Sequence, residues 1–147
     1  MKYIHTNIIA KDWKKLADFY IKVFGCIKVP PERDLRGKWI DIGTGIDGVH
    51  IEGAHLRLPG YGDDGPTLEI FQYNKLASVE TQQINRQGLA HIAFRVDDVQ
   101  ETLKEVLSAG GRQLSDIIRE YIPSLGTITF VYTKDPEGNF IEIQKYD

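Results

Sequence analysis

Cysteine is almost absent from this sequence, because Cys26 is the only one among 147 residues. A disulfide within the chain and a zinc site built from cysteines are therefore both excluded. Cys26 directly follows Gly25. We interpret it as a small buried side chain rather than a reactive thiol.

The sequence also lacks an excess of positive charge and any long apolar run. Its 18 basic residues are outnumbered by 21 acidic ones, and the net charge is −3. No basic cluster stands out, so we do not expect nucleic acid as a partner. No segment approaches the roughly 18 consecutive apolar residues of a membrane span, and the N-terminal residues lack the apolar core of a signal peptide. These features predict a single soluble domain in the cytoplasm, without a membrane partner.

An internal repeat organises the residues that are present. The alignment that places His5 on His91 also matches residues 4–8 with 90–94, Asp12 with Asp98, and Gly25 with Gly111. A repeat of this kind indicates two copies of one structural unit.

Each copy opens with a predicted strand followed by a predicted helix. Residues 3–9 and 89–96 are rich in the β-branched and aromatic side chains that favour strands. Asp12 in the first copy, and Asp97 or Asp98 in the second, are expected to cap the helices that follow. Apolar residues then recur at helical spacing, and glycines at 25 and at 110–111 are expected to end the two helices.

Three further strands are expected in each copy. We predict them at residues 38–42, 49–58 and 67–73 in the first copy and at 111–114, 127–133 and 139–145 in the second. Realigning the last strands that follow the turn-forming segments 58–62 and 134–138 places Glu69 on Glu142, so the first copy carries extra residues, expected within 43–66. The predicted fold is therefore α+β, one domain of two tandem βαβββ modules at residues 1–73 and 89–147, joined by a polar linker at 74–88.

Both copies place a histidine in the first strand and a glutamate in the last. These are His5 and Glu69 in one copy and His91 and Glu142 in the other. Taken singly, such residues are more often core histidines and solvated strand glutamates. A pseudo-two-fold relation between the copies would bring all four together, and two neutral imidazoles with two carboxylates balance the charge of one divalent cation. Nitrogen and oxygen donors suit zinc, nickel, cobalt, manganese or ferrous iron.

Strand alternation predicts the other residues of the same surface. The side chains that share strand parity with the four proposed ligands, and are expected to bind substrate, are Asn7, Phe71, Ala93, Phe140 and Gln144. On residues 49–58, alternation places His55 and Arg57 on one face and His50 and Glu52 on the other, so at most one of these pairs can face the site.

Three segments carry a resemblance to a known family. Residues 5–25, 88–98 and 135–142 resemble the signatures of the vicinal oxygen chelate superfamily, which includes glyoxalase I, methylmalonyl-CoA epimerase, extradiol dioxygenases and bleomycin resistance proteins. The resemblance implies glyoxalase-like βαβββ modules whose sheets curl into a cup around a metal, with ligands at His5, Glu69, His91 and Glu142. Ile9 stands where glyoxalase I has an arginine that contacts glutathione, which argues against glutathione here.

The favoured hypothesis is a metal-dependent lyase or isomerase. Its small-molecule substrate would chelate the metal through two neighbouring oxygens and lose a proton to form an enediolate, with Glu69 or Glu142 as the base. The alternatives are an extradiol-type dioxygenase and a drug-binding resistance protein without catalytic activity. We also expect a homodimer, because curled sheets leave open edges, and the metal site lies either within one chain or between two.

Overall fold

The computed structural model describes residues 1–77 and 83–147. The chain divides into two compact units, Met1–Ser78 and Val79–Asp147. This boundary falls inside the predicted linker at 74–88, of which residues 78–82 lie outside the described part of the chain.

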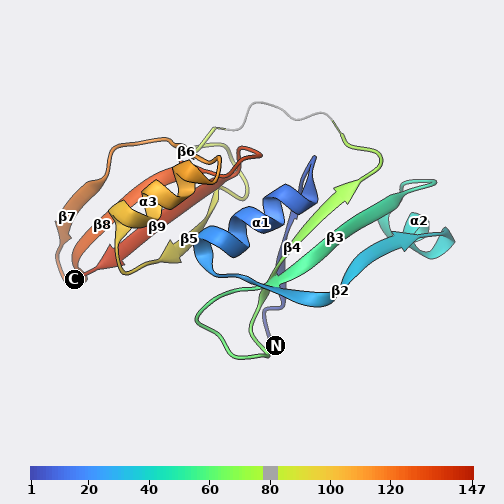
Figure 1. Ribbon diagram of the computed structural model, residues 1–147, viewed down its shortest axis with the longest axis horizontal. Helices are drawn as coiled ribbons and strands as arrows, with labels where there is room; N and C mark the ends of the chain where they lie inside the picture. The colour runs from blue at the N-terminus through green and yellow to red at the C-terminus, as the bar shows by residue number, and fades with distance from the viewer. Residues whose placement is uncertain (78–82) are drawn as a thin grey trace. The chain divides into compact units, whose positions relative to one another are not determined.

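The first unit is a four-stranded sheet, and its longer helix lies across one face of that sheet (Figure 1). Its elements, in chain order, are β1 (His5–Ile9), α1 (Trp13–Phe24), β2 (Ile27–Arg36), α2 (Lys38–Thr44), β3 (His50–Arg57) and β4 (Thr67–Tyr73). The strand order is β1-β4-β3-β2. The β1 and β4 strands are parallel, whereas the other neighbours are antiparallel.

Helix α1 begins and ends where the sequence predicts. The Asp12 carboxylate accepts a hydrogen bond from the Lys15 backbone N–H at 3.2 Å, and Gly25 has a φ of 66°, which suits a glycine after the last turn. The buried face of α1, which includes Leu16 and Tyr20, packs against β3 and β4. The side chains that these two strands bury beneath the helix are Ala54, Leu56, Leu68 and Ile70. Because side chains alternate along a strand, residues 55, 69 and 71 belong to the opposite face.

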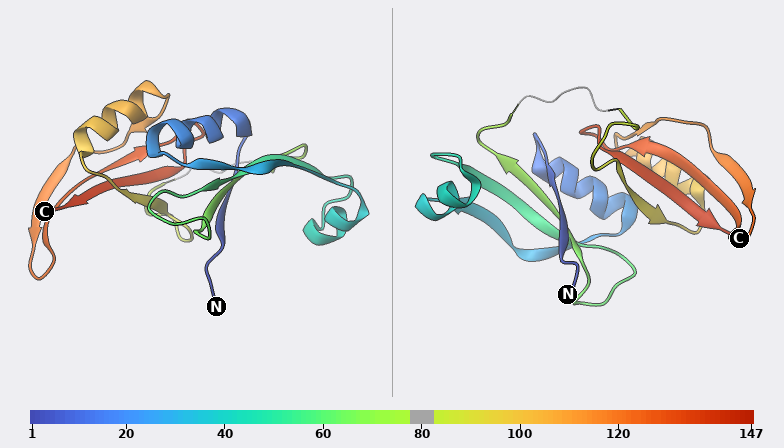
Figure 2. Two further views of the ribbon diagram at one scale, coloured as in Figure 1. Left: turned by 60° about the horizontal axis from the view of Figure 1, so that its bottom comes forward. Right: turned by 180° about the vertical axis from the view of Figure 1, so that it is seen from behind.

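The second unit repeats this topology. Its elements are β5 (His91–Arg95), α3 (Val99–Ser108), β6 (Arg112–Gln113), β7 (Ile118–Ile122), β8 (Gly126–Lys134) and β9 (Phe140–Tyr146). The strand order is β5-β9-β8-β6, and β7 also pairs with β8. Figure 2 shows α3 lying against β8 and β9. The predicted α+β fold of two βαβββ units is therefore confirmed, and Asp98 rather than Asp97 caps α3.

The prediction of a strand at residues 38–42 is wrong, because these residues form most of α2. Gly37 and Gly45, with φ of 100° and 72°, flank the helix, and the Asp41 carboxylate accepts from the Val49 backbone N–H. The strand lies earlier, at Ile27–Arg36, where two consecutive prolines hid it. Prolines are tolerated there because β2 is an edge strand, and its register shifts between Val29 and Arg33.

The extra residues of the first unit begin earlier than the predicted region 43–66. Residues 37–49 stand between β2 and β3, where the second unit has only a short turn between β7 and β8. The longer connection from β3 to β4, residues 58–66, does lie in the predicted region. Strand β7 was not predicted, because it is an edge strand with mostly exposed side chains and shows no apolar alternation.

Helix α2 covers one end of the β3–β4 face that does not carry α1. Ile40 of α2 and Ile46 of the following turn pack with the buried side chains of Val49, Ile51 and Phe71. On β4, Phe71 is the residue of this apolar cluster that lies nearest to Glu69. Among the described residues, no helix is long and apolar enough to cross a membrane.

Candidate functional site

Three side chains from three strands meet on the open face of the first unit. The Glu69 carboxylate, on β4, lies 3.3 Å from His5 Nε2 on β1 and 2.9 Å from His55 Nε2 on β3. The two imidazoles approach different oxygens, His5 approaching Oε2 and His55 approaching Oε1. Asn7 Nδ2 also donates to Oε2, at 3.3 Å.

Glu69 is a buried carboxylate, with only 8% of the residue exposed. A buried negative charge is costly unless hydrogen bonds or a cation compensate for it. The two imidazoles and the Asn7 amide provide that compensation here. The His5 side chain remains 43% exposed, so this polar cluster is open to solvent on one side.

His55 is not among the predicted site residues, because the predicted strand parity separates it from His50 without deciding which of the two faces the site. It lies opposite Glu69 in the β3–β4 register, on the face away from α1. His50 lies on the other face and contacts the Asp34 carboxylate at 2.7 Å. Burial lowers the pKa of the His55 imidazole, against the opposing influence of the Glu69 carboxylate. The signal that could have singled out His55 was its spacing from Glu69 across a predicted hairpin.

The second unit carries the equivalent histidine–glutamate pair. His91 Nε2 on β5 lies 3.0 Å from Glu142 Oε2 on β9. The strand registers match those of the first unit, because Ala93 pairs with Glu142 as Asn7 pairs with Glu69. The repeat predicted from the sequence is therefore a repeat of side-chain geometry as well as of strands.

Tyr132 occupies the position in the second unit that His55 occupies in the first. It lies opposite Glu142 in the β8–β9 register, and its ring meets the His91 ring edge-on with centroids 5.3 Å apart. Burial and the nearby Glu142 carboxylate both raise the pKa of the Tyr132 phenol. The phenol is therefore neutral near pH 7.

The predicted substrate-binding residues share the faces of these pairs, but their exposure differs. Asn7 and Ala93 are exposed, and Gln144 is half-buried. Phe71 is buried and meets the His55 ring at 5.8 Å, and Phe140 is buried beneath the Lys134 ammonium group, 4.5 Å from the ring centroid. The two phenylalanines therefore form walls rather than freely accessible contacts.

The donor set fits a divalent metal in its chemistry. Each unit presents one imidazole nitrogen at about 3 Å from a carboxylate oxygen, the separation expected of neighbouring ligands on an ion bound at about 2.1 Å. Within residues 1–77 and 83–147, however, no group of three or more His, Cys, Asp or Glu side chains is arranged so that it could hold a metal ion.

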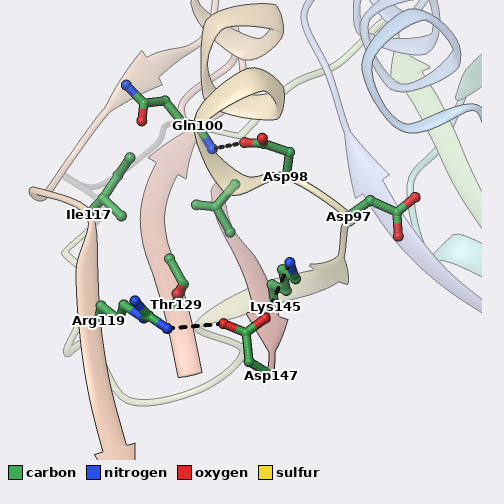
Figure 3. Close-up of a pocket in the computed structure, with 9 residues that line it drawn as sticks. Asp97, Asp98, Gln100, Ile117, Arg119, Thr129, Lys145 and Asp147 are labelled. Carbon is green, nitrogen blue, oxygen red and sulfur yellow. Dashed lines mark hydrogen bonds and ion pairs between the residues drawn. The ribbon is translucent and has the colours of Figure 1, made fainter. Parts of the chain in front are cut away.

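A separate cavity of about 300 Å³ lies at the N-terminal end of α3 (Figure 3). It contains none of the predicted site residues. Lys145 has the strand parity of the buried Ile141 and Ile143, so the cavity is on the α3 face, away from Glu142. Arg119 and Lys145 both contact the Asp147 carboxylate, at 3.4 and 3.2 Å.

Comparison with known proteins identifies the family. The family model described as the Glyoxalase/Bleomycin resistance protein/Dioxygenase superfamily matches residues 2–143. The chain belongs to this superfamily. The resemblance found in the sequence motifs is therefore confirmed.

Relatives and solved structures agree with this assignment. A probable lactoylglutathione lyase of Vibrio cholerae is 28% identical over 97% of this chain and 88% of its own length. The mitochondrial methylmalonyl-CoA epimerase of Dictyostelium discoideum is 22% identical over 98% of this chain and 78% of its own. A glyoxalase family protein from Bacillus cereus shares the fold with a TM-score of 0.79 and 17% identity, over 99% of this chain and 92% of that protein. Superfamily membership and these relatives support a glyoxalase-like enzyme.

Proposed function

We propose that this superfamily member is a metal-dependent lyase or isomerase that moves a proton at the carbon beside a carbonyl group. The observation that carries the proposal is the repeated pair, His5 with Glu69 and His91 with Glu142, on corresponding strands of both units. Two such pairs supply the four ligands of one divalent ion. The ion would supply Lewis-acid stabilisation of the negative charge that develops on the substrate oxygens.

The carboxylates account for the proton transfer. Glu69 or Glu142 accepts the proton from the substrate carbon, and the electron pair of the broken C–H bond remains on the substrate. The same carboxylic acid then returns the proton at the neighbouring position, or the other of the two glutamates, protonated from solvent, delivers a proton to the opposite face of the original carbon while the first releases its proton to solvent. Both carboxylates are largely shielded from water.

The relatives suggest the class of substrate. Their names refer to lactoylglutathione and methylmalonyl-CoA. Both compounds are thioesters with a second oxygen-bearing group on the carbon beside the carbonyl. Such compounds have the two neighbouring oxygens that the proposed chemistry requires, so we propose a small acyl thioester or α-hydroxycarbonyl compound as the substrate.

Hydrogen exchange at the substrate carbon tests this function directly. The zinc-, cobalt-, nickel- or manganese-loaded protein is incubated in D₂O with methylmalonyl-CoA, lactoylglutathione or an α-hydroxyketone, and loss of the α-proton signal is followed by NMR. We expect exchange with at least one of them. Replacing the base by glutamine keeps an oxygen donor for the metal but removes the proton acceptor, so Glu69→Gln or Glu142→Gln should slow exchange by about 100-fold or more.

Glu52→Gln is the matched control, because Glu52 lies on β3 on the opposite face from Glu69 and is exposed. It should exchange at the wild-type rate. Oxygen uptake with a catechol and ferrous iron, without exchange in any thioester or ketone, would instead support a dioxygenase. Tight binding of a drug such as bleomycin without turnover would support a resistance protein.

We further propose that the protein acts as a homodimer. The curled sheets of both units end in edge strands, β1 and β2 in the first and β5 in the second, which pairing of subunits commonly covers in soluble proteins. Sedimentation equilibrium should give twice the chain mass at micromolar concentration. A monomer under those conditions would contradict this part of the proposal.

A further inference from the structure

We propose that His55 is a positioning residue, which fixes the orientation of the Glu69 carboxylate so that its Oε2 atom faces His5. This inference rests on the proposed function, because it assigns a role within the same site. It concerns a side chain that neither the repeat nor the predicted ligand set includes.

The hydrogen-bond geometry gives His55 a direction. Its Nδ1 atom lies 3.4 Å from the Thr67 hydroxyl oxygen, and its Nε2 atom lies 2.9 Å from Glu69 Oε1. A carboxylate only accepts, so a neutral imidazole must carry its proton on Nε2 to make the shorter bond. The Thr67 hydroxyl then donates to Nδ1. The resulting chain runs from Thr67 through His55 to one oxygen of Glu69.

Packing holds the His55 ring in place. Its side chain is only 19% exposed. The ring meets Phe71 edge-on at 5.8 Å and His5 edge-on at 6.2 Å. Phe71 is in turn packed into the apolar cluster with Val49 and Ile51. The His55 ring, which donates to Glu69, is thus held in place by packing against the apolar cluster. The Glu69 carboxylate cannot rotate without breaking the 2.9 Å hydrogen bond from His55.

The position of His55 argues for support rather than direct metal binding. His5 and Asn7 approach Glu69 Oε2, whereas His55 approaches Oε1. Ligands of one ion converge on a common point. His5 and His55 instead approach different oxygens of Glu69, so His55 is not placed as a second histidine ligand beside His5. Partners that orient a ligand through its second atom commonly change metal affinity by 10- to 100-fold.

In the second unit, no histidine stands opposite the glutamate on the neighbouring strand. Tyr132 stands opposite Glu142 where His55 stands opposite Glu69, and it contacts the ring of His91. The two carboxylates are therefore related by the repeat but are supported differently. Glu69 is held between two imidazoles, and Glu142 faces one.

The test measures metal affinity and coordination in three variants of the full chain. Zinc affinity is measured by competition with a chromophoric chelator, and the visible spectrum of the cobalt-loaded protein reports on the ligands. His55→Leu should weaken zinc binding by about 10- to 100-fold. His55→Gln restores an N–H donor towards Glu69 and should recover most of the affinity. His50→Leu, on the other face of the same strand, should bind as the wild type does.

Coordination distinguishes a positioning role from that of a ligand. The cobalt bands should keep their positions in all three variants, because His55 does not touch the ion. Bands that shift in both His55→Leu and His55→Gln, with equal losses of affinity, would make His55 a ligand and overturn the proposal. Wild-type affinity in His55→Leu would also overturn it. Thermal unfolding of the metal-free variants verifies that each is folded.

A readout without metal separates this inference from the proposed function. In ¹⁵N-histidine NMR of the metal-free protein, His55 should carry its proton on Nε2, and Thr67→Val should shift its Nδ1 resonance. If the wild type binds no metal while these signals are as expected, the proposed function fails and the positioning of Glu69 stands. A proton on Nδ1 overturns the positioning role whatever the metal result.

Discussion

The only thiol of the chain shows how burial decides the chemistry of a single residue. Cys26 follows the left-handed Gly25 at the end of α1, and only 2% of it is exposed. Burial raises the pKa of the Cys26 thiol to about 12. The reactive form of cysteine is the thiolate, which is therefore scarce at any physiological pH. The interpretation of Cys26 as a packed side chain is confirmed.

We therefore expect Cys26 to resist alkylation in the folded protein. At pH 8, a free cysteine with an ordinary pKa near 8.5 is partly ionised, whereas Cys26 remains protonated because its pKa is raised. Mass spectrometry after treatment with iodoacetamide should show an unmodified chain, and a single adduct once urea unfolds it. Rapid labelling of the folded protein at pH 8 would contradict the burial of this thiol.

The residues of the candidate site differ in how far the sequence reveals them. The repeat marks His5, Glu69, His91 and Glu142, because the same residue type returns at the same strand position. The repeat does not single out His55, because the corresponding residue of the second unit is Tyr132. Its role depends on the β3–β4 register, and the exact pairing of two strands becomes known only when the turn between them is placed.

Among the secondary-structure elements, α2 shows why local patterns are insufficient. The sequence of Lys38–Thr44 contains the aromatic Trp39 and the β-branched Ile40 and Ile42, residue types that favour strands, yet it forms a short helix. Packing of Ile40 and Ile46 against Val49, Ile51 and Phe71 stabilises that helix. These contacts are tertiary and cannot be read from the segment alone. The longer helices α1 and α3 were predictable, because each combines a capping aspartate with a sustained apolar stripe.

The start of α3 provides a prediction on capping. The Asp98 carboxylate accepts from the backbone N–H groups of Gln100 and Glu101, at 2.8 and 3.0 Å. Asp98→Ala removes both bonds and should lower the free energy of unfolding by about 1 kcal/mol. Asp97→Ala is the control and should remain within roughly 0.5 kcal/mol of wild type. Urea denaturation measures both, and an equal loss in the two variants would argue against Asp98 as the cap.

Strand β3 provides a prediction on close packing. A Cβ atom on Gly53 would lie 2.2 Å from the Ile70 carbonyl oxygen and 2.4 Å from Phe71 Cδ1. Because the first of these is backbone, Gly53→Ala must displace β4 or Phe71, and we expect a loss of about 1–3 kcal/mol in unfolding free energy. Glu69 lies two residues before Phe71 on the same strand, so metal binding should weaken as well.

Gly43→Ala is the matched control for this substitution. Gly43 lies in α2, and a Cβ atom there has no neighbour within 4 Å. Alanine is favoured over glycine inside a helix by roughly 0.5–1 kcal/mol, so this variant should be as stable as wild type or slightly more stable. If thermal unfolding showed Gly53→Ala to be as stable as Gly43→Ala, this result would contradict the close approach of β3 and β4 at Gly53.

At the scale of the whole molecule, the proposal requires both units for one metal ion. Each unit supplies one histidine–glutamate pair, and two ligands hold a divalent ion far more weakly than four. We therefore expect His5→Ala and His91→Ala each to lose most of the bound metal, as measured by elemental analysis after gel filtration. His50→Ala, which removes a histidine outside the site, should keep it. Full metal content in either His5→Ala or His91→Ala would contradict a shared site.

Mixing the two variants then determines which chains supply the ligands. If both pairs come from the same chain, every chain in the mixture lacks one ligand, and the mixture should bind no more metal than the separate variants. If one pair comes from each subunit of a homodimer, a mixed dimer has one site with both substitutions and one site with neither. Random exchange of subunits makes about half of the dimers mixed, so about a quarter of the wild-type metal content should return. Unfolding the two variants together and refolding them provides the exchange, and the His5→Ala protein refolded alone is the control. Recovery of metal in the mixture, with none in that control, would place the site between subunits, whereas equal low values would place it within one chain.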